Sequence, residues 1–251
     1  MTSAFEHDQA EAVTAAYAQG LGLEPSVFRH GQLTIASRPA HAPWPYWAMA
    51  VSLPGGTVLS LDASLVEVAR RAAPRRPFRA AQAEFLRTLA AAVERTGPRV
   101  VIDGPNISWS LSRVPEAPAL PPDLALVVRD AAWMNAEQAS GRFPNGVGEP
   151  GRNAREFRNR YAAVVVDAAG EPVAVGGLFS TFGLAEVGVD VVPERQGEGL
   201  GVGVVVAAVR LALERGETPL YGCAVTNIRS QRTAAAAGFV PLFTDATIES
   251  A

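Results

Sequence analysis

The segment 186–215 constrains the fold more than any other part of the chain, because a glycine-rich turn joins an alternating strand to an apolar helix there. Every second residue of its first part is valine, up to Val191, which predicts a strand with one apolar face. Pro193 cannot donate a hydrogen bond to a neighbouring strand, so the strand should end near it. The helix is expected from about Gly199 to Arg215, with Gly216 ending it. The chain therefore contains at least one strand–turn–helix unit of the α/β type.

The turn of this unit carries three alternating glycines, Gly197, Gly199 and Gly201. The first backbone N–H groups of a helix have no partner within the helix, and the helix dipole adds partial positive charge there. Glycine leaves these groups accessible, since no Cβ stands in the way. The turn thus predicts an anion site, such as one for a pyrophosphate. From the turn alone, a glycine-rich loop without a ligand explains the pattern equally well.

Two other phosphate-binding loops do not fit the turn. A P-loop needs Gly-Lys followed by Ser or Thr, but all 22 Lys and Arg residues of this chain are arginine. The missing lysine also excludes a Schiff base with pyridoxal phosphate. A Rossmann fingerprint needs GxGxxG and an acid after the next strand; here Val202 replaces the third glycine, and no acid follows the strand that ends at Val225.

The turn resembles the acyl-CoA motif of the GNAT superfamily of N-acetyltransferases, Arg/Gln-x-x-Gly-x-Gly/Ala, which Gln196 to Gly201 match. A second element of that family, Asn-x-x-Ser/Ala followed by Gly-Phe, matches Asn227 to Ser230 and then Gly238-Phe239. One helix and one strand separate the two elements, as in the family. The pair is more specific than either element alone, and the resemblance covers residues 124–243, about half of the chain.

The resemblance implies that acetyl-CoA binds as a co-substrate, without a metal. Backbone groups of Val189, Asp190 and Val191 are expected to pair with its pantetheine arm. Asn227 and Ser230 are expected near the cofactor, and both residue types also favour helix caps. The pyrophosphate is expected on the backbone of the turn, formed by Gln196, Gly197, Glu198, Gly199, Leu200 and Gly201.

The candidate catalytic groups depart from the family's pattern. Many enzymes of the family use a tyrosine acid seven residues after the motif asparagine, where this chain has Ala234. Tyr221 and Ser230 are the nearest substitutes, and Tyr221 is the candidate acid. Glu186 and Asp190 are the candidate bases, but four strand residues separate them by about 13 Å, so they should not act as a close pair. Orienting the substrate or pairing with arginine is the competing interpretation for both acids.

A proline-rich stretch, Ser112 to Asp123, divides the chain, because it can sustain neither helix nor central strand. We expect a smaller α+β domain of unknown role over residues 1–118 and a GNAT-like α/β domain, a mixed sheet with helices on both faces, over residues 119–251. Helices are predicted at 10–19, 62–72, 78–96, 131–140, 199–215 and 228–237. Strands are predicted at 32–37, 47–53, 58–61, 100–102, 124–129, 161–166, 172–180, 186–192, 220–225 and 239–243.

Composition excludes some classes of function. A net charge of −3 argues against nucleic acid as the main partner. The sequence contains no CxxC or HExxH motif that would indicate a metal site. The apolar run 200–213 is too short to cross a membrane. The single cysteine, Cys223, cannot form an intrachain disulfide and should be buried and inert. We expect a cytoplasmic protein, with a homodimer as an open alternative.

Arginines gather in two places. The five between 70 and 79 are interpreted as a solvated helix end rather than an anion patch. The five between 142 and 160 precede a strand, at a place that borders the acceptor in the family, so they favour an acceptor with a carboxylate or phosphate as much as a solvated loop. Three aromatic residues are expected to pack in a core or between domains rather than line a pocket, namely Trp44, Tyr46 and Trp47.

The sequence thus predicts an N-acetyltransferase that transfers an acetyl group directly to a small amine or amino-acid-like acceptor in a ternary complex. Ala234 favours the alternative, a non-catalytic acyl-CoA-binding or regulatory module. In a third interpretation the N-terminal part binds a protein partner whose amine the GNAT-like part modifies.

Overall fold

A computed structural model describes residues 3–42, 45–116, 119–150 and 158–251, which form two compact units. The larger unit comprises Met1–Val13, Trp109–Gly222 and Ile228–Val240, and the smaller unit comprises Thr14–Ser108, Cys223–Asn227 and Pro241–Ala251. Because the two units alternate along the chain, the predicted division after residue 118 stays a prediction.

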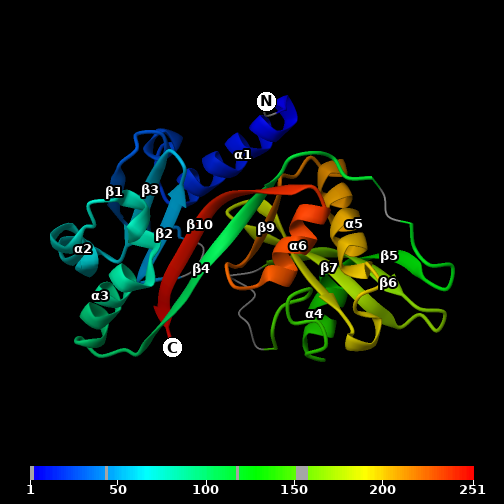
Figure 1. Ribbon diagram of the computed structural model, residues 1–251. Helices are drawn as coiled ribbons and strands as arrows, with labels where there is room; N and C mark the ends of the chain where they lie inside the picture. The colour runs from blue at the N-terminus through cyan, green and yellow to red at the C-terminus, as the bar shows by residue number, and fades with distance from the viewer. Residues whose placement is uncertain (1–2, 43–44, 117–118, 151–157) are drawn as a thin grey trace. The chain divides into compact units, whose positions relative to one another are not determined.

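The larger unit contains a five-stranded part of sheet in the order β9-β8-β7-β6-β5 (Figure 1). Strands β5 to β8 pair antiparallel, and β9 pairs parallel to β8. The elements are β5 (Ala125–Asp130), α4 (Ala131–Gln138), β6 (Arg158–Val166), β7 (Pro172–Thr181), β8 (Leu184–Val191), α5 (Leu200–Glu214), β9 (Pro219–Ala224) and α6 (Ile228–Ala236).

Helices cover both faces of this sheet. Met134 of α4 packs in one buried cluster with Val175, whereas Val204 of α5 packs in another with Ala174. Neighbouring residues of a strand point to opposite faces, so α4 and α5 lie on opposite faces. This arrangement is the mixed α/β sheet with helices on both faces that the sequence predicts.

Two adjacent glycines of β7 bring both layers into close contact with the strand. A Cβ at Gly176 would overlap the carbonyl oxygen of Val204 and lie 2.8 Å from its carbonyl carbon. A Cβ at Gly177 would overlap the carbonyl oxygen of Gly146 on the other face. Both contacts involve backbone atoms, which cannot move aside as a flexible side chain can. The glycines therefore set how closely α5 and the segment around Gly146 approach the sheet.

The smaller unit contains another part of the sheet and has a core of its own. Its strands follow the order β1-β3-β2-β10-β4; β3 pairs parallel to β1, and β2 pairs antiparallel to β3 and β10. The elements are β1 (Leu33–Ser37), β2 (Ala48–Leu53), β3 (Gly56–Leu61), α2 (Val66–Ala72), α3 (Ala83–Glu94), β4 (Val100–Leu111) and β10 (Phe239–Ser250), with α1 (Ala4–Gly20) preceding them.

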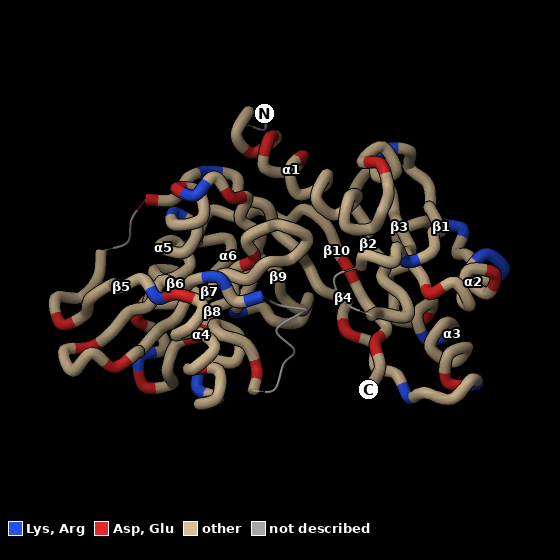
Figure 2. Tube along the Cα trace, turned by 180° about the vertical axis from the view of Figure 1, so that it is seen from behind, with Lys and Arg blue, Asp and Glu red and all other residues tan. Residues whose placement is uncertain are grey.

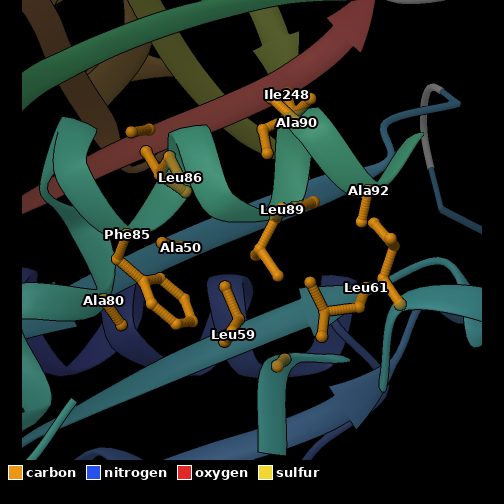
Figure 3. Packing of buried hydrophobic residues seen from close by; sticks show 14 of the residues in the cluster. Ala50, Leu59, Leu61, Ala80, Phe85, Leu86, Leu89, Ala90, Ala92 and Ile248 are labelled. Atoms are coloured by element: carbon orange, nitrogen blue, oxygen red, sulfur yellow. The ribbon is translucent and has the colours of Figure 1, made fainter. Parts of the chain in front are cut away.

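Helix α3 supplies Phe85, Leu86, Leu89 and Val93 to that core. Figure 3 shows Phe85, Leu86 and Leu89 pointing from α3 toward the β3 residues Leu59 and Leu61. Apolar residues at this spacing occupy one face of a helix, which is why the sequence predicts α3 correctly. The arginines that follow α2 are exposed, as expected for a solvated helix end, and Figure 2 marks them in blue beside α2.

The sequence predicts every helix and strand above, but it predicts several of them too short. Helix α1 begins at Ala4 rather than at residue 10, and β6 begins at Arg158 rather than at residue 161. Strand β4 continues from Val100 to Leu111 through Gly104 and Pro105, residue types that usually end a strand. Strand β10 continues to Ser250, well beyond the predicted end at residue 243. The predicted helix 78–96 is also divided, because Gln82 has extended backbone angles and a separate 3₁₀ turn precedes α3.

Among the aromatic residues expected in the core, Tyr46 is fully buried, and its hydroxyl lies 2.9 Å from Ser60 Oγ. Trp47 is half-buried and packs against the core of the smaller unit, whereas Trp44 lies outside the described residues. Among the described helices, none combines the length and apolar character that a membrane crossing requires.

The substitution Gly176→Ala should lower the free energy of unfolding by about 2–3 kcal/mol, because the added methyl group overlaps backbone atoms of α5. Gly201→Ala is the matched control: its Cβ would meet Val191 Cγ2 at an ordinary 3.5 Å. Urea unfolding followed by circular dichroism measures both variants. Equal midpoints for Gly176→Ala and wild type would show that the contact does not limit the packing of α5.

Candidate functional site

The turn before α5 leaves its backbone open. Gly199 is the N-cap of α5 with φ 81°, and no side chain caps the helix. Gly197 also has a positive φ, of 94°. A Cβ built on either glycine would have no heavy atom of the described residues within 4 Å, so those residues leave the space beside both glycines open. Glycine adopts these backbone angles without strain and keeps the turn accessible.

The amino end of α5 carries backbone donors that the helix itself does not use. The first intrahelical hydrogen bond runs from Gly203 N to Gly199 O at 3.1 Å. The amides of Leu200, Gly201 and Val202 precede it and have no partner within the helix. Together with the helix dipole, they form a site that favours an anion.

Side chains on both sides fix the turn. Gln196 Nε2 donates to Val191 O at 3.1 Å, and Gln196 Oε1 accepts from Arg229 Nη1 at 2.8 Å. Arg195 Nε donates to both carboxylate oxygens of Glu198 at 2.8 Å. Gln196 thus links the end of β8 to the first turn of α6. Sequence reasoning missed Arg229, although it lies inside the predicted Asn227–Ser230 motif.

Strands β8 and β9 pair over only part of their length. The parallel register runs from Ala185–Pro219 to Val187–Tyr221, whereas β8 continues to Val191 and β9 to Ala224. On its other edge β8 pairs with β7 as far as Val191. Within the described part of the chain, the β9-side edge of Val189 to Val191 is therefore not paired with β9. This edge is where the sequence predicts pairing with pantetheine.

The two candidate sources of an acidic proton lie together. Tyr221 is buried in β9, and its hydroxyl lies 2.8 Å from Ser230 Oγ in the first turn of α6. Its ring packs against Phe239 with the centroids 5.6 Å apart. Asn227 N donates to Ala224 O at 2.9 Å, which places Asn227 in the turn immediately before α6.

Glu186 and Asp190 project from β8 on the same side as α4, because their β7 partners Phe179 and Val175 belong to the α4 cluster. Glu186 Oε2 accepts from Thr181 Oγ1 at 2.6 Å. The Asp190 carboxylate accepts from Asn145 N at 2.6 Å, Asn145 Nδ2 at 2.8 Å and Gly146 N at 2.7 Å. The two acids therefore have different environments, and that of Asp190 is dominated by one backbone segment.

Most of the described arginines before and within β6 have acidic partners. Arg142 lies 3.9 Å from Glu137 and 3.7 Å from Glu171, and Arg160 pairs with Glu217. Burial, followed by the hydrogen bond to Glu217, raises the pKa of the neighbouring Tyr161 well above its usual value. Arg158 is exposed, whereas Arg152 and Arg155 lie outside the described residues. An acceptor that bears a carboxylate or phosphate stays a prediction.

The expected burial of Cys223 is wrong. This residue is partly exposed, because it follows the last β9 residue that pairs with β8. Among the described residues, no group of three His, Cys, Asp or Glu side chains is placed to hold a metal ion.

No protein-family model and no curated protein match this sequence. Solved structures do match it. A tandem GNAT protein from the clavulanic acid biosynthesis pathway aligns over 96% of this chain and 95% of its own, with a TM-score of 0.52 and 16% identity. A Drosophila protein aligns over 85% of this chain and 77% of its own, with a TM-score of 0.52 and 17% identity.

A GCN5-related N-acetyltransferase-like protein from Streptococcus suis aligns over 65% of this chain and 68% of its own, with a TM-score of 0.46 and 15% identity. This chain spans less than two thirds of three further GNAT structures, 61%, 66% and 55% of their lengths. At such identities the likeness shows the fold alone, and two of these structures reach a TM-score of 0.52. The chain has the GNAT fold, and the likeness extends beyond the predicted C-terminal half to 96% of the chain.

The hydrogen bond between Tyr221 and Ser230 should give a coupling free energy of about 1 kcal/mol in a double-mutant cycle of Tyr221→Phe and Ser230→Ala, because both hydroxyls lie within packed structure. Tyr46→Phe and Ser60→Ala provide a reference cycle, as that pair has an O–O distance of 2.9 Å in the smaller unit. Urea unfolding measures both cycles. A coupling near zero at Tyr221 and Ser230, with a normal reference value, would contradict the bond.

Proposed function

We propose that this chain, which has the GNAT fold, is an N-acyltransferase that takes an acetyl group from acetyl-CoA. The observation that carries the proposal is the uncapped amino end of α5 behind two open glycines, Gly197 and Gly199. Such an end binds a pyrophosphate through its backbone amides and its dipole. The GNAT fold of its structural relatives supports the proposal.

The residues of the site fit acetyl-CoA as co-substrate. The turn from Gln196 to Gly201 would hold the pyrophosphate, and Arg229, fixed by Gln196, adds positive charge beside it. The stretch from Val189 to Val191 is not paired with β9 and would offer backbone donors and acceptors to the amides of the pantetheine arm, apart from Val191 O, which accepts from Gln196 Nε2. Asn227 and Ser230, at the amino end of α6, would contact the cofactor near the divergence of β8 and β9.

In the proposed reaction a small amine or amino-acid-like acceptor attacks the thioester carbonyl directly. Glu186, on the α4 face of β8, accepts the proton of the amine, directly or through water. The C–N bond forms and the C–S bond breaks, and the leaving thiolate receives a proton from the Tyr221 hydroxyl. Binding both substrates in one ternary complex supplies much of the rate.

One observation favours a second candidate function, a non-catalytic acyl-CoA-binding or regulatory module. Ala234 is fully buried where a related enzyme would place its tyrosine acid, so that position offers no hydroxyl. In this case the protein would bind acetyl-CoA but acetylate no amine. We retain the cytoplasm as the proposed compartment and a homodimer as an open alternative, with no role for nucleic acid or a membrane.

Calorimetric titration of the wild type with acetyl-CoA should show micromolar binding that Gly199→Asp weakens by at least about 50-fold, because the variant puts negative charge and a side chain at the anion site. Gly183→Asp is the matched control: Gly183 has a φ of 83° and open space, like Gly199, but lies in the turn between β7 and β8. The wild type failing to bind, or equal losses in both variants, would refute the proposed cofactor site.

Glu186→Gln should lower kcat/KM for the amine by about 100-fold while the Kd for acetyl-CoA stays unchanged, because the amide cannot accept the proton. Glu171→Gln, which changes an exposed acid in the turn between β6 and β7, should leave both constants at the wild-type value. Initial rates measured across a pH range provide the readout. Undiminished turnover of Glu186→Gln at every pH would remove Glu186 as the base.

A further inference from the structure

The segment 143–148 lies over β7 and β8, and the Asp190 carboxylate binds its centre. One oxygen of Asp190 accepts from the backbone amides of Asn145 and Gly146, at 2.6 Å and 2.7 Å. The other oxygen accepts from the Asn145 side chain at 2.8 Å. Three hydrogen bonds to an ionised acceptor are short and strong. They occupy both oxygens of a residue that the sequence alone presents as a candidate base.

Two paired glycines form the floor beneath this segment. Gly177 of β7 and Gly188 of β8 are register partners, next to the pair of Val175 and Asp190 on the same face. A Cβ at Gly177 would overlap the carbonyl oxygen of Gly146, and a Cβ at Gly188 would overlap that of Asn145. The segment therefore rests on the backbone of the sheet, with no room for a side chain between them.

Both flanks of the segment are held as well. Phe143 and Val147 are buried in the cluster that contains Met134 of α4. Asn159 Nδ2 donates to Val147 O at 3.1 Å, and Gln138 Nε2 donates to Glu149 O at 2.7 Å. The segment is thus held by the sheet beneath it, by Asp190 at its centre and by hydrogen bonds at its carboxyl end. We call the backbone of residues 145–146, held in this way, the wall.

This wall stands beside the proposed base. Glu186 and Asp190 each lie two residues from Gly188 on the same face, about 7 Å along the strand. Two groups lie over Gly188, the Asn145 carbonyl and the ring edge of Phe179, the register partner of Glu186. The segment therefore covers β8 between the strand positions of the two acids. An acceptor that reaches Glu186 from this face meets the backbone of Asn145 and Gly146 on the side toward Asp190.

We propose that Asp190 is a positioning residue that holds the segment 145–146 as a fixed wall of the acceptor site, and that this wall restricts acceptors to small amines. Asp190 acts through the segment and takes no proton from the substrate. The proposal rests on the proposed function, since it assigns an acceptor site to the α4 face beside Glu186. An extended peptide cannot lie along β8 there, because backbone already covers Gly188 at contact distance.

The first test is hydrogen exchange, measured residue by residue by NMR on the full chain. In Asp190→Asn the amides of Asn145 and Gly146 should exchange at least about tenfold faster, because a neutral amide is a weaker acceptor. Asp167→Asn is the matched control, since Asp167 accepts from the amides of Ala169 and Glu171, both at 2.9 Å, in the turn between β6 and β7. Unchanged exchange at residues 145 and 146 in Asp190→Asn would overturn the proposal.

The second test uses acetyl-CoA with two sets of probes: single amino acids and aminoalcohols, and tetrapeptides with the same amino-terminal residues. The wild type should prefer the small amines. Asp190→Asn should raise KM for the best small amine about tenfold, with kcat within about twofold of the wild-type value. The variant should also prefer the small amine over the tetrapeptide less strongly than the wild type does. Asp167→Asn should match the wild type. Two results would overturn the proposed role of the segment as a wall. One is a wild type that prefers the tetrapeptides, and the other is an unchanged KM in Asp190→Asn despite faster exchange at residues 145 and 146.

The two tests separate this inference from the proposed function. Wild-type protein that binds no acetyl-CoA would refute the proposed function, and the exchange of Asn145 and Gly146 would still decide whether Asp190 holds the segment. If the wild type binds acetyl-CoA and prefers small amines, but Asp190→Asn changes neither the amide exchange nor KM, the proposed function stands and the role of Asp190 is refuted.

Discussion

The close backbone packing at Gly176 and Gly177 determines the geometry of the candidate site. These neighbours in β7 face opposite sides of the sheet, and each accepts backbone at a distance that a Cβ would forbid. Helix α5 is thereby placed from one side, and the segment around Gly146 from the other. The turn proposed as the anion site and the proposed acceptor wall are both positioned against the same strand, although 50 or more residues separate Gly146 from the turn at Gln196 and Gly197.

A turn that is rich in glycine serves binding only if nothing fills the space that it opens. Here no side chain from the described part of the chain caps α5, and nothing in that part fills the space beside Gly197 or Gly199. Gln196 instead fixes the turn by hydrogen bonds to Val191 and Arg229. The support therefore lies behind the backbone donors and does not compete with an anion for them.

Local patterns explain what the sequence could predict. The strand, the turn and helix α5 depend on residues within about 30 positions, and each has a periodic or glycine signature. The hydrogen bonds of Asp190 join residues 44 and 45 positions apart, and no local pattern encodes them. The full length of β4 could not be predicted for the same reason. Gly104 and Pro105 are residue types that usually end a strand, but pairing with neighbouring strands continues through them. Arg229 could have been found, because the motif that contains it was already recognised.

The bond between Tyr221 and Ser230 bears on whether Ala234 argues against catalysis. Ser230 and Ala234 are four residues apart in α6, so they lie on the same face of the helix, one turn or about 5.4 Å along its axis. The Tyr221 hydroxyl reaches this face from β9 and meets it at Ser230. A phenol is therefore present one helical turn from Ala234, toward Asn227 and the divergence of β8 and β9. Because Tyr221 pairs with Val187, whose side chain opposes that of Glu186, the candidate acid and the candidate base lie on opposite faces of the sheet. In the proposed reaction the amine would therefore lose its proton on one face, and the thiolate would receive a proton from the other.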